Sequence, residues 1–164
     1  MLKRRHLLIA GAGGAAALVA LRFGMPAPRA ADAHFEVMHT DAEWRAMLTP
    51  HQYNVLRQSG TERPYSSPLD KEKRAGTFAC AGCKLALFSS ETKFDSRTGW
   101  PSFWKPLDNA IATEADTSLG MSRDAVYCRQ CGGHLGHVFN DGPPPTGLRY
   151  CMNGVAMTFT PRAA

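Results

Sequence analysis

An excess of basic over acidic residues is lacking outside the first 33 residues of this 164-residue chain, although its formal net charge is +5. The first 33 residues hold five of the 19 Lys and Arg side chains and one of the 14 acidic ones, which leaves 14 bases against 13 acids in the rest. Binding to a phosphate backbone requires several clustered Lys and Arg side chains. We therefore expect no nucleic-acid partner. The nearly neutral remainder also carries no heptad pattern, so we expect a monomer.

The sequence also lacks an apolar run long enough to cross a bilayer. Its longest run, Leu7 to Leu21, has about 15 residues rich in Gly and Ala, whereas a spanning helix needs about 20. Lys3-Arg4-Arg5 before this run and Ala31-Asp32-Ala33 after it are typical of an export signal. The paired arginines favour the twin-arginine type over the general secretory (Sec) type. We expect residues 1–33 to be a cleaved export signal, which predicts a periplasmic protein without stable membrane association.

Residues 34–59 are predicted to form a short helical segment that covers the main domain. Thr40 is followed three residues later by Glu43, which is the spacing of a capping box, and apolar residues then recur at helical spacing. Thr49 precedes Pro50, which is typical of an N-cap followed by proline at the first helical position. We therefore expect two short helices in this segment.

From Gly60 onward, the sequence is predicted to form a mainly antiparallel β domain. Short apolar stretches alternate with Gly, Pro, Asn and Asp, which is the pattern of strands separated by turns. No fixed-period repeat or low-complexity tract interrupts this pattern. The predicted strands are residues 77–79, 85–88, 125–128, 137–139, 148–152 and 155–159.

Four of the five cysteines occur in two pairs of identical spacing, Cys80 with Cys83 and Cys128 with Cys131. Each CxxC turn aims two thiolates at one point, and two such turns supply the closed tetrahedral set of sulfurs that a structural zinc ion prefers. Disulfides are the alternative in an exported protein, but within CxxC they would close very short loops and constrain little. A thioredoxin-like redox pair is disfavoured because no βαβ pattern surrounds either motif. We expect one structural Zn²⁺.

The fifth cysteine, Cys151, has no partner once the two pairs are assigned. Arg149 would lie on the same face of a strand, and a nearby positive charge lowers the pKa of a thiol toward the reactive thiolate. A buried structural cysteine is the alternative, because free cysteine often behaves as a small apolar residue. The neighbouring charge favours a nucleophile.

Two histidines three residues apart, His134 and His137, precede Asp141. They could be metal ligands, hydrogen-bonded core groups or proton donors. A second metal is disfavoured because the four cysteines already fill one zinc shell. Asp141 could orient an imidazole.

An aromatic-rich segment, residues 94–104, holds Gly99-Trp100-Pro101, which places an aromatic ring on a rigid turn. Such rings could belong to the core. A pocket wall is the alternative, since a thioether methyl packs well against aromatic faces.

Taken together, these motifs resemble the B-type methionine sulfoxide reductases. The resemblance extends from Gly60 to Phe159 and implies a fold of two small antiparallel sheets with a structural zinc. We therefore assign residues 60–164 to a zinc-containing reductase domain, expected to reduce the R epimer of methionine sulfoxide in oxidised protein substrates. The resemblance rests on GTERP at 60–64, the two CxxC motifs, FDSRTGWPSFW at 94–104 and GGHLGHVFNDGPPPTGLRYCMNG at 132–154.

The resemblance also implies roles for individual residues. Cys151 matches the nucleophile, which would attack the sulfoxide sulfur while His137 delivers a proton, giving methionine and a Cys151 sulfenic acid. Trp100 matches the aromatic that receives the substrate methyl, and Phe139 is expected to contact the substrate as well. The polar groups expected around the nucleophile are His134, His137, Asp141, Arg149 and Asn153.

The sequence departs from the family pattern at Thr98, where many relatives resemble this stretch but carry a cysteine. That cysteine forms a disulfide with the nucleophile, which thioredoxin then reduces. Because it is absent here, we expect a thioredoxin-like or other external thiol to reduce the Cys151 sulfenic acid directly, with recruitment of a zinc cysteine as the alternative. The rival functions are a non-enzymatic zinc-binding interaction module and another thiol oxidoreductase.

Overall fold

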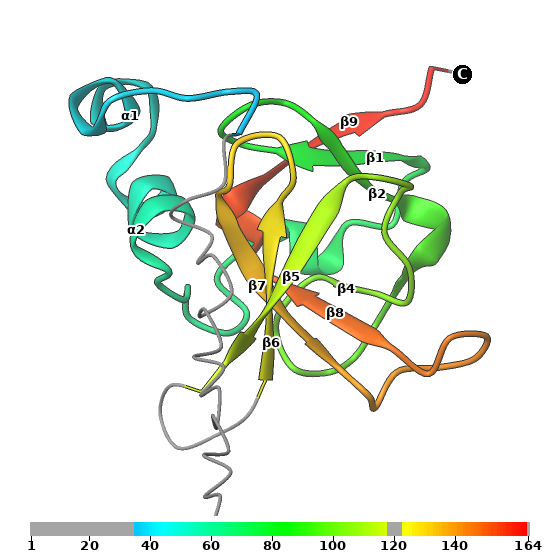
Figure 1. Cartoon of the computed structure of the whole chain (residues 1–164). Coiled ribbons are helices and arrows are strands. Elements are labelled where there is room, and N and C mark those ends of the chain that lie inside the picture. Colours follow the sequence, from blue (N-terminus) through cyan, green and yellow to red (C-terminus); the bar gives the residue numbers. More distant parts are fainter. Residues whose placement is uncertain (1–34, 118–122, 164) are drawn as a thin grey trace, which may run out of the picture.

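The computed structural model describes residues 35–117 and 123–163, and the predicted export signal at residues 1–33 lies outside them. Figure 1 shows how the helices and strands of these two ranges are arranged. Within them, no helix has both the length and the apolar character that a membrane crossing requires.

Two short helices precede the strands, as the sequence predicts. They are α1, Asp41–Met47, and α2, Pro50–Gln58. The Thr40 hydroxyl accepts a hydrogen bond from the Glu43 amide, and the Glu43 carboxylate accepts one from the Thr40 amide. Thr49 and Gln52 form the same reciprocal pair at the start of α2. Both predicted helix starts are therefore confirmed, and each is fixed by side chains within one turn of the chain.

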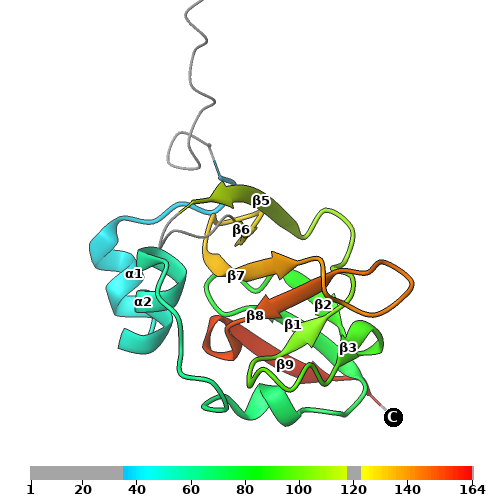
Figure 2. The same cartoon turned by 90° about the horizontal axis from the view of Figure 1, so that it is seen from below.

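The strands form two antiparallel sheets, which confirms the predicted mainly β fold. The smaller sheet has the order β2-β1-β9, with β1 at Gly76–Cys80, β2 at Ala86–Ser89 and β9 at Met157–Pro161. The larger sheet has the order β3-β4-β8-β7-β6-β5. Its strands are β3 at Lys93–Phe94, β4 at Ser102–Phe103, β8 at Arg149–Met152, β7 at His134–Phe139, β6 at Arg123–Cys128 and β5 at Ile111–Asp116. In Figure 2 the strands β5, β6, β7 and β8 follow one another across the molecule, with β1 and β9 beyond β8.

The strands differ from the prediction at several places. The sequence pattern does not predict β3 and β4, which have two residues each, and β7 begins at His134 instead of residue 137. Strand β9 begins at Met157 instead of residue 155, because Gly154–Ala156 form a 3₁₀ turn, η5. The sequence pattern does not predict β5, because four of its six residues are exposed and no apolar alternation marks them. Two further 3₁₀ turns are η2, Pro68–Lys71, and η3, Ser90–Thr92.

Aromatic residues join the two sheets. Phe78 of β1 and Phe103 of β4 are fully buried, and their ring centroids lie 5.0 Å apart. Phe88 of β2 stacks on Phe103 with the centroids 4.3 Å apart. Aromatic pairs of this kind add about 0.5–1.5 kcal/mol each beyond the area that they bury. Phe103, from the aromatic-rich segment, is therefore a core residue.

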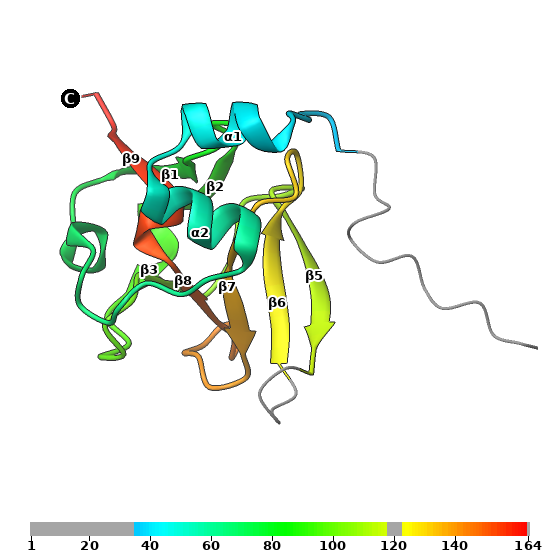
Figure 3. The ribbon, with the colours of Figure 1, turned by 90° about the vertical axis from the view of Figure 1, so that its left-hand side faces the viewer.

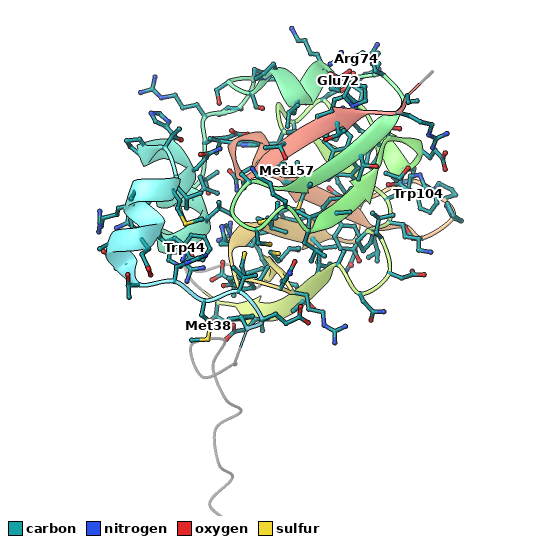
Figure 4. All side chains as sticks on the ribbon, turned by 90° about the horizontal axis from the view of Figure 1, so that it is seen from above. Met38, Trp44, Glu72, Arg74, Trp104 and Met157 are labelled. Carbon is teal, nitrogen blue, oxygen red and sulfur yellow. The ribbon has the colours of Figure 1, made fainter. Side chains whose placement is uncertain are left out.

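The helices cover the end of the molecule at which the cysteine turns lie (Figure 3). Trp44 of α1 and Leu56 of α2 are buried, and both pack against Gly82 between the first pair of cysteines. The Arg57 guanidinium donates a hydrogen bond of 3.0 Å to the Cys131 carbonyl. Figure 4 shows Trp44 on this helical side of the molecule and Trp104 on the opposite side. The helical segment thus shares its core with the strands.

Candidate metal centre and active site

The four paired cysteines meet at one point. Their sulfur atoms all lie within 4.8 Å of one another, and none of the five cysteines is in a disulfide. The Sγ atoms of Cys80 and Cys131 are 3.7 Å apart, and those of Cys83 and Cys128 are 3.5 Å apart. Four sulfurs at about 2.3 Å from a tetrahedral zinc ion are separated by about 3.8 Å. The four cysteines are therefore positioned to bind a metal ion, and the disulfide alternative is wrong for this structure.

The two cysteine turns have the same backbone conformation. In the first, the Lys84 amide donates to the Cys80 carbonyl at 2.9 Å, and in the second the Gly132 amide donates to the Cys128 carbonyl at 2.9 Å. Both Lys84 and Gly132 have a φ of 66°, in the left-handed region. Two turns of one geometry therefore aim their thiols at the same point from two different sheets, since Cys80 ends β1 and Cys128 ends β6.

Cys151 lies within a row of side chains on one face of the larger sheet. It is directly opposite Ser102 of β4 on one side and His137 of β7 on the other. Directly opposite residues of antiparallel strands project from the same face, with their β-carbons about 5 Å apart. The fold thus places the expected nucleophile beside the expected proton donor.

A second row of side chains lies on the same face, two residues further along each strand. Phe139 is opposite Arg149, and Asp116 is opposite Arg123. The Arg149 guanidinium carbon lies 4.3 Å from the centre of the Phe139 ring. Arg149 and Phe139 therefore stand together next to the row that holds Cys151.

A β-bulge places His134 near His137. Residues three apart on a regular strand face opposite sides of a sheet. Here the register shifts between Val126 and Tyr127, so that Tyr127 is opposite His134 while Val126 is opposite Gly136. The two histidine rings consequently lie edge to face, with centroids 5.4 Å apart. Burial, and then the neighbouring His137, lower the pKa of His134 to about 4, so this ring is neutral at neutral pH.

The carboxylate that contacts the His137 ring is Asp116. His137 Nε2 lies 2.9 Å from Asp116 Oδ2, and the Arg123 guanidinium donates to the same oxygen at 3.0 Å. Asp116 is not predicted as a site residue from the sequence, because it ends the exposed strand β5, which has no hydrophobic pattern of its own. Its only signal is the pairing of β5 with β6, which exists in the folded sheet alone.

Asp141 does not contact an imidazole, so the hypothesis that it orients one is wrong. Its two carboxylate oxygens accept hydrogen bonds of 2.8 and 2.9 Å from Arg149. This fork-to-fork geometry holds the guanidinium over Phe139. The Arg149 guanidinium also holds the pKa of Asp141 below its usual value.

Cys151 is partly buried. Burial raises its pKa, whereas the Thr98 hydroxyl, the Arg149 charge and the Ser102 hydroxyl act to lower it. The net direction is upward, because removing a thiolate from water outweighs the three favourable contacts. The expectation that Arg149 brings this pKa below its ordinary value is therefore wrong for the protein without substrate.

Two polar residues hold Trp100 against the turn that follows Cys151. The Trp100 indole donates to the Glu62 carbonyl at 3.2 Å, and the Glu62 carboxylate accepts from the amides of Gly154 and Val155 at 2.6 and 2.9 Å. The buried Asn153 side chain accepts from the Glu62 amide at 2.9 Å and donates to the Leu135 carbonyl at 3.0 Å. Asn153 therefore positions the GTERP segment. Glu62, which links Trp100 to the turn after Cys151, is not predicted as a site residue from the sequence.

Residues 48–161 match the SelR domain, over most of the described chain. A peptide methionine sulfoxide reductase MsrB from Pseudomonas putida (strain W619) is 60% identical over 121 residues, which are 73% of this chain and 91% of that protein. This chain belongs to the B-type methionine sulfoxide reductase family. A family member from Leptospira interrogans is 50% identical, over 77% of this chain and 97% of its own length. One from Bradyrhizobium diazoefficiens is 48% identical, over 84% of this chain and all of its own.

Within this B-type reductase, Thr98 occupies the space beside Cys151. Its Oγ1 atom is 3.8 Å from the Cys151 sulfur. In the sequence analysis this is the position at which many relatives carry a second cysteine. The structure therefore places a hydroxyl that cannot form a disulfide next to the expected nucleophile.

Proposed function

We propose that this protein reduces the R epimer of methionine sulfoxide in oxidised proteins to methionine, with Cys151 as the nucleophile. The observation that carries the proposal is the row of Ser102, Cys151 and His137 on one sheet face. Membership of a family whose relatives are named peptide methionine sulfoxide reductases supports it.

The chemistry moves one oxygen atom and two electrons. The Cys151 thiolate attacks the sulfoxide sulfur, a proton reaches the sulfoxide oxygen, and that oxygen ends on the cysteine as a sulfenic acid while methionine leaves. His137 supplies the proton. Because its Nε2 contacts Asp116, Nδ1 is the ring nitrogen left to give the proton to the sulfoxide oxygen.

Aromatic faces bind the substrate methyl group in this proposal. Trp100 is anchored through its indole nitrogen, which leaves the ring face for contact with the thioether carbon. Phe139 lies two residues from His137 on the same strand face and carries the Arg149 guanidinium above it. The guanidinium keeps this side of the site polar, so a sulfoxide oxygen binds there more favourably than an apolar side chain would.

The metal ion is Zn²⁺ in this proposal, and its role is structural. Cys80, Cys83, Cys128 and Cys131 would hold it with no open position, so it would cross-link the ends of β1 and β6. When bound, zinc supplies stability and no redox chemistry. Because β1 and β6 belong to different sheets, the ion would link the two sheets directly.

Turnover needs an external thiol. The residue of β6 aligned with Cys151, across β7, is Ala125. Cys128 lies three residues further along β6, so its α-carbon is about 14 Å from that of Cys151. A disulfide needs α-carbons within about 7 Å. A thioredoxin-like or other thiol is therefore the proposed reductant: two thiols convert the sulfenic acid to thiol and water and become a disulfide.

We also propose a periplasmic location, reached through the export signal at residues 1–33. The paired arginines would direct a folded chain to the export machinery, so that zinc could be bound before transport, and the Sec route is the alternative. The neutral remainder supports a monomer whose partners are oxidised proteins and a thiol reductant.

The test uses the zinc-loaded protein, dithiothreitol and a peptide that carries either epimer of methionine sulfoxide, with methionine formation followed by mass spectrometry. We expect reduction of the R epimer only, and none by a folded Cys151→Ser variant. If well-folded protein reduces neither epimer, the proposal fails and a zinc-binding interaction module takes its place. Faster reduction of free methionine sulfoxide than of the peptide would identify a different reductase.

A further inference from the structure

Three hydroxyl groups connect the Cys151 sulfur to the backbone of Trp100. Thr98 Oγ1 is 3.8 Å from the Cys151 sulfur and 2.8 Å from Ser96 Oγ, and Ser96 Oγ is 2.7 Å from Ser102 Oγ. The Ser102 hydroxyl in turn donates to the Trp100 carbonyl at 3.1 Å. Ser102 is fully buried, so its hydroxyl bonds to these protein groups and not to solvent. The result is a continuous chain with a carbonyl at one end and the reactive sulfur at the other.

The direction of this chain is fixed while Ser102 donates to Trp100. Each hydroxyl has one proton, so Ser102 must then accept from Ser96, and Ser96 must accept from Thr98. Thr98 is left to accept, and the group that donates to it is the Cys151 thiol. This direction therefore suits the protonated cysteine and satisfies every hydroxyl.

The opposite direction suits the thiolate. If each hydroxyl rotates and keeps its own proton, Ser102 turns from the Trp100 carbonyl to Ser96 or to the sulfur, which it also faces. Ser96 then donates to Thr98, and Thr98 donates to the sulfur. The thiol proton leaves toward His137 or the sulfoxide oxygen on the other side of the sulfur, so the chain itself carries no proton away. Only the Trp100 carbonyl loses a partner.

We propose that Thr98, Ser96 and Ser102 act as one reversible hydrogen-bond chain, which accepts from the Cys151 thiol and donates to the Cys151 thiolate. Thr98 contacts the reacting sulfur directly. Ser96 acts only through its neighbours and is a positioning residue. The inference rests on the proposed function only in taking Cys151 as the nucleophile.

Ser96 gives the sharpest test because its hydroxyl contacts Thr98 and Ser102, whereas Thr98 contacts the sulfur. If only direct contacts with the sulfur matter, Ser96→Ala changes nothing, since Thr98 and Ser102 remain in place. If the chain acts as a unit, Ser96→Ala leaves Thr98 without a partner behind it and weakens its hydrogen bond to the thiolate.

The experiment measures the rate at which iodoacetamide alkylates Cys151 in the zinc-loaded protein, from pH 5 to 10, by mass spectrometry of the Cys151 peptide. This assay needs no sulfoxide. The hydrogen-bond chain can therefore be refuted while the proposed function stands, and the proposed function can be refuted while the chain stands. We expect Ser96→Ala to lower the rate at neutral pH by about twofold to fivefold and to move the midpoint of the curve upward. Ser96→Thr keeps the hydroxyl and should restore the rate.

Thr98 and a matched control complete the design. Thr98→Val should lower the rate by about tenfold, because it removes a hydrogen bond to a charged group. The double variant with Ser96→Ala should be no slower than Thr98→Val, since both break one chain. Ser66→Ala, an exposed serine that donates only within its own turn, should behave like the unchanged protein.

Other charged or titratable groups face Cys151 as well, namely His137 from β7 and Arg149 from its own strand, with Asp116 behind His137. They are the same in every variant, so their effect on the alkylation rate is common to all curves. The proposal is overturned if folded Ser96→Ala matches Ser66→Ala at every pH. If Ser96→Ala does not fold, equal rates for Thr98→Val and Thr98→Ser overturn it.

Discussion

His137 Nε2 contacts Asp116 Oδ2 at 2.9 Å, although β6 lies between their two strands in the larger sheet. Asp116 ends the edge strand β5, whereas His137 lies in the middle of β7 beside Cys151. Arg123 binds the same carboxylate oxygen, so the acid is held from a second side. Such a contact orients the imidazole, which makes Asp116 a positioning residue for the proposed proton donor.

Replacing Asp116 tests this relationship. We expect Asp116→Asn to lower kcat by about tenfold to a hundredfold, within the range ascribed to general acid catalysis, with little change in KM. The measurement is steady-state reduction of a sulfoxide peptide across pH. The matched control is Asp124→Asn, which changes an exposed acid of the neighbouring strand. Equal kcat values for the two variants would mean that the Asp116 contact is only structural.

His134 should make the fold sensitive to acid. Burial lowers its pKa to about 4, below the ordinary 6.5, so the unfolded chain binds a proton between these pH values and the folded chain does not. Stability is therefore complete above pH 6.5 and falls as the pH drops toward 4, by an amount on the order of 3 kcal/mol. Urea unfolding at several pH values should show a shallower loss for His134→Phe than for the unchanged protein. Parallel curves would refute this source of acid sensitivity.

Thr98 lies close enough to Cys151 for a thiol at its position to react. With Thr98→Cys, one equivalent of sulfoxide should give a disulfide between the introduced thiol and Cys151, seen as a loss of two hydrogen masses. The unchanged protein should instead give a sulfenic acid that a 1,3-diketone reagent traps. Thr113→Cys, on the exposed strand β5, should behave like the unchanged protein. A trapped sulfenic acid in the Thr98→Cys variant would contradict the geometry.

Removal of the metal should destabilise the whole fold, because the cysteine cluster joins β1 of one sheet to β6 of the other. We expect a chelator that strips zinc to lower the melting temperature by more than about 10 °C, measured by calorimetry. The Cys128→Ser variant should already melt at the lowered temperature without chelator, and adding chelator should change its melting temperature little. A chelated protein that melts unchanged would mean that the cluster holds no stabilising ion.

Several features could be predicted from the sequence because they depend on residues close together in the chain. The capping pairs of Thr40 with Glu43 and of Thr49 with Gln52 are complete within one turn. Each cysteine pair is likewise fixed by its own turn, and the spacing alone indicates two metal-binding knuckles. The alternation of short apolar stretches with turn residues was enough to predict a mainly β fold.

Other features depend on which strands pair and in which register, and no local pattern carries that information. The bulge opposite Tyr127 brings His134 to the same face as His137. The pairing of β5 with β6 brings Asp116 to the sheet face that carries Cys151 and His137. The pairing of β4 with β8 brings Ser102 beside Cys151.

The sequence by itself thus determined the two helix starts and the two cysteine turns, because each is encoded in neighbouring residues. Only the tertiary structure decided which acid contacts the histidine, that Asp141 pairs with Arg149 instead, and that burial raises the pKa of Cys151. The physical reason is that these outcomes depend on distances and desolvation between strands, which arise only when the two sheets are assembled.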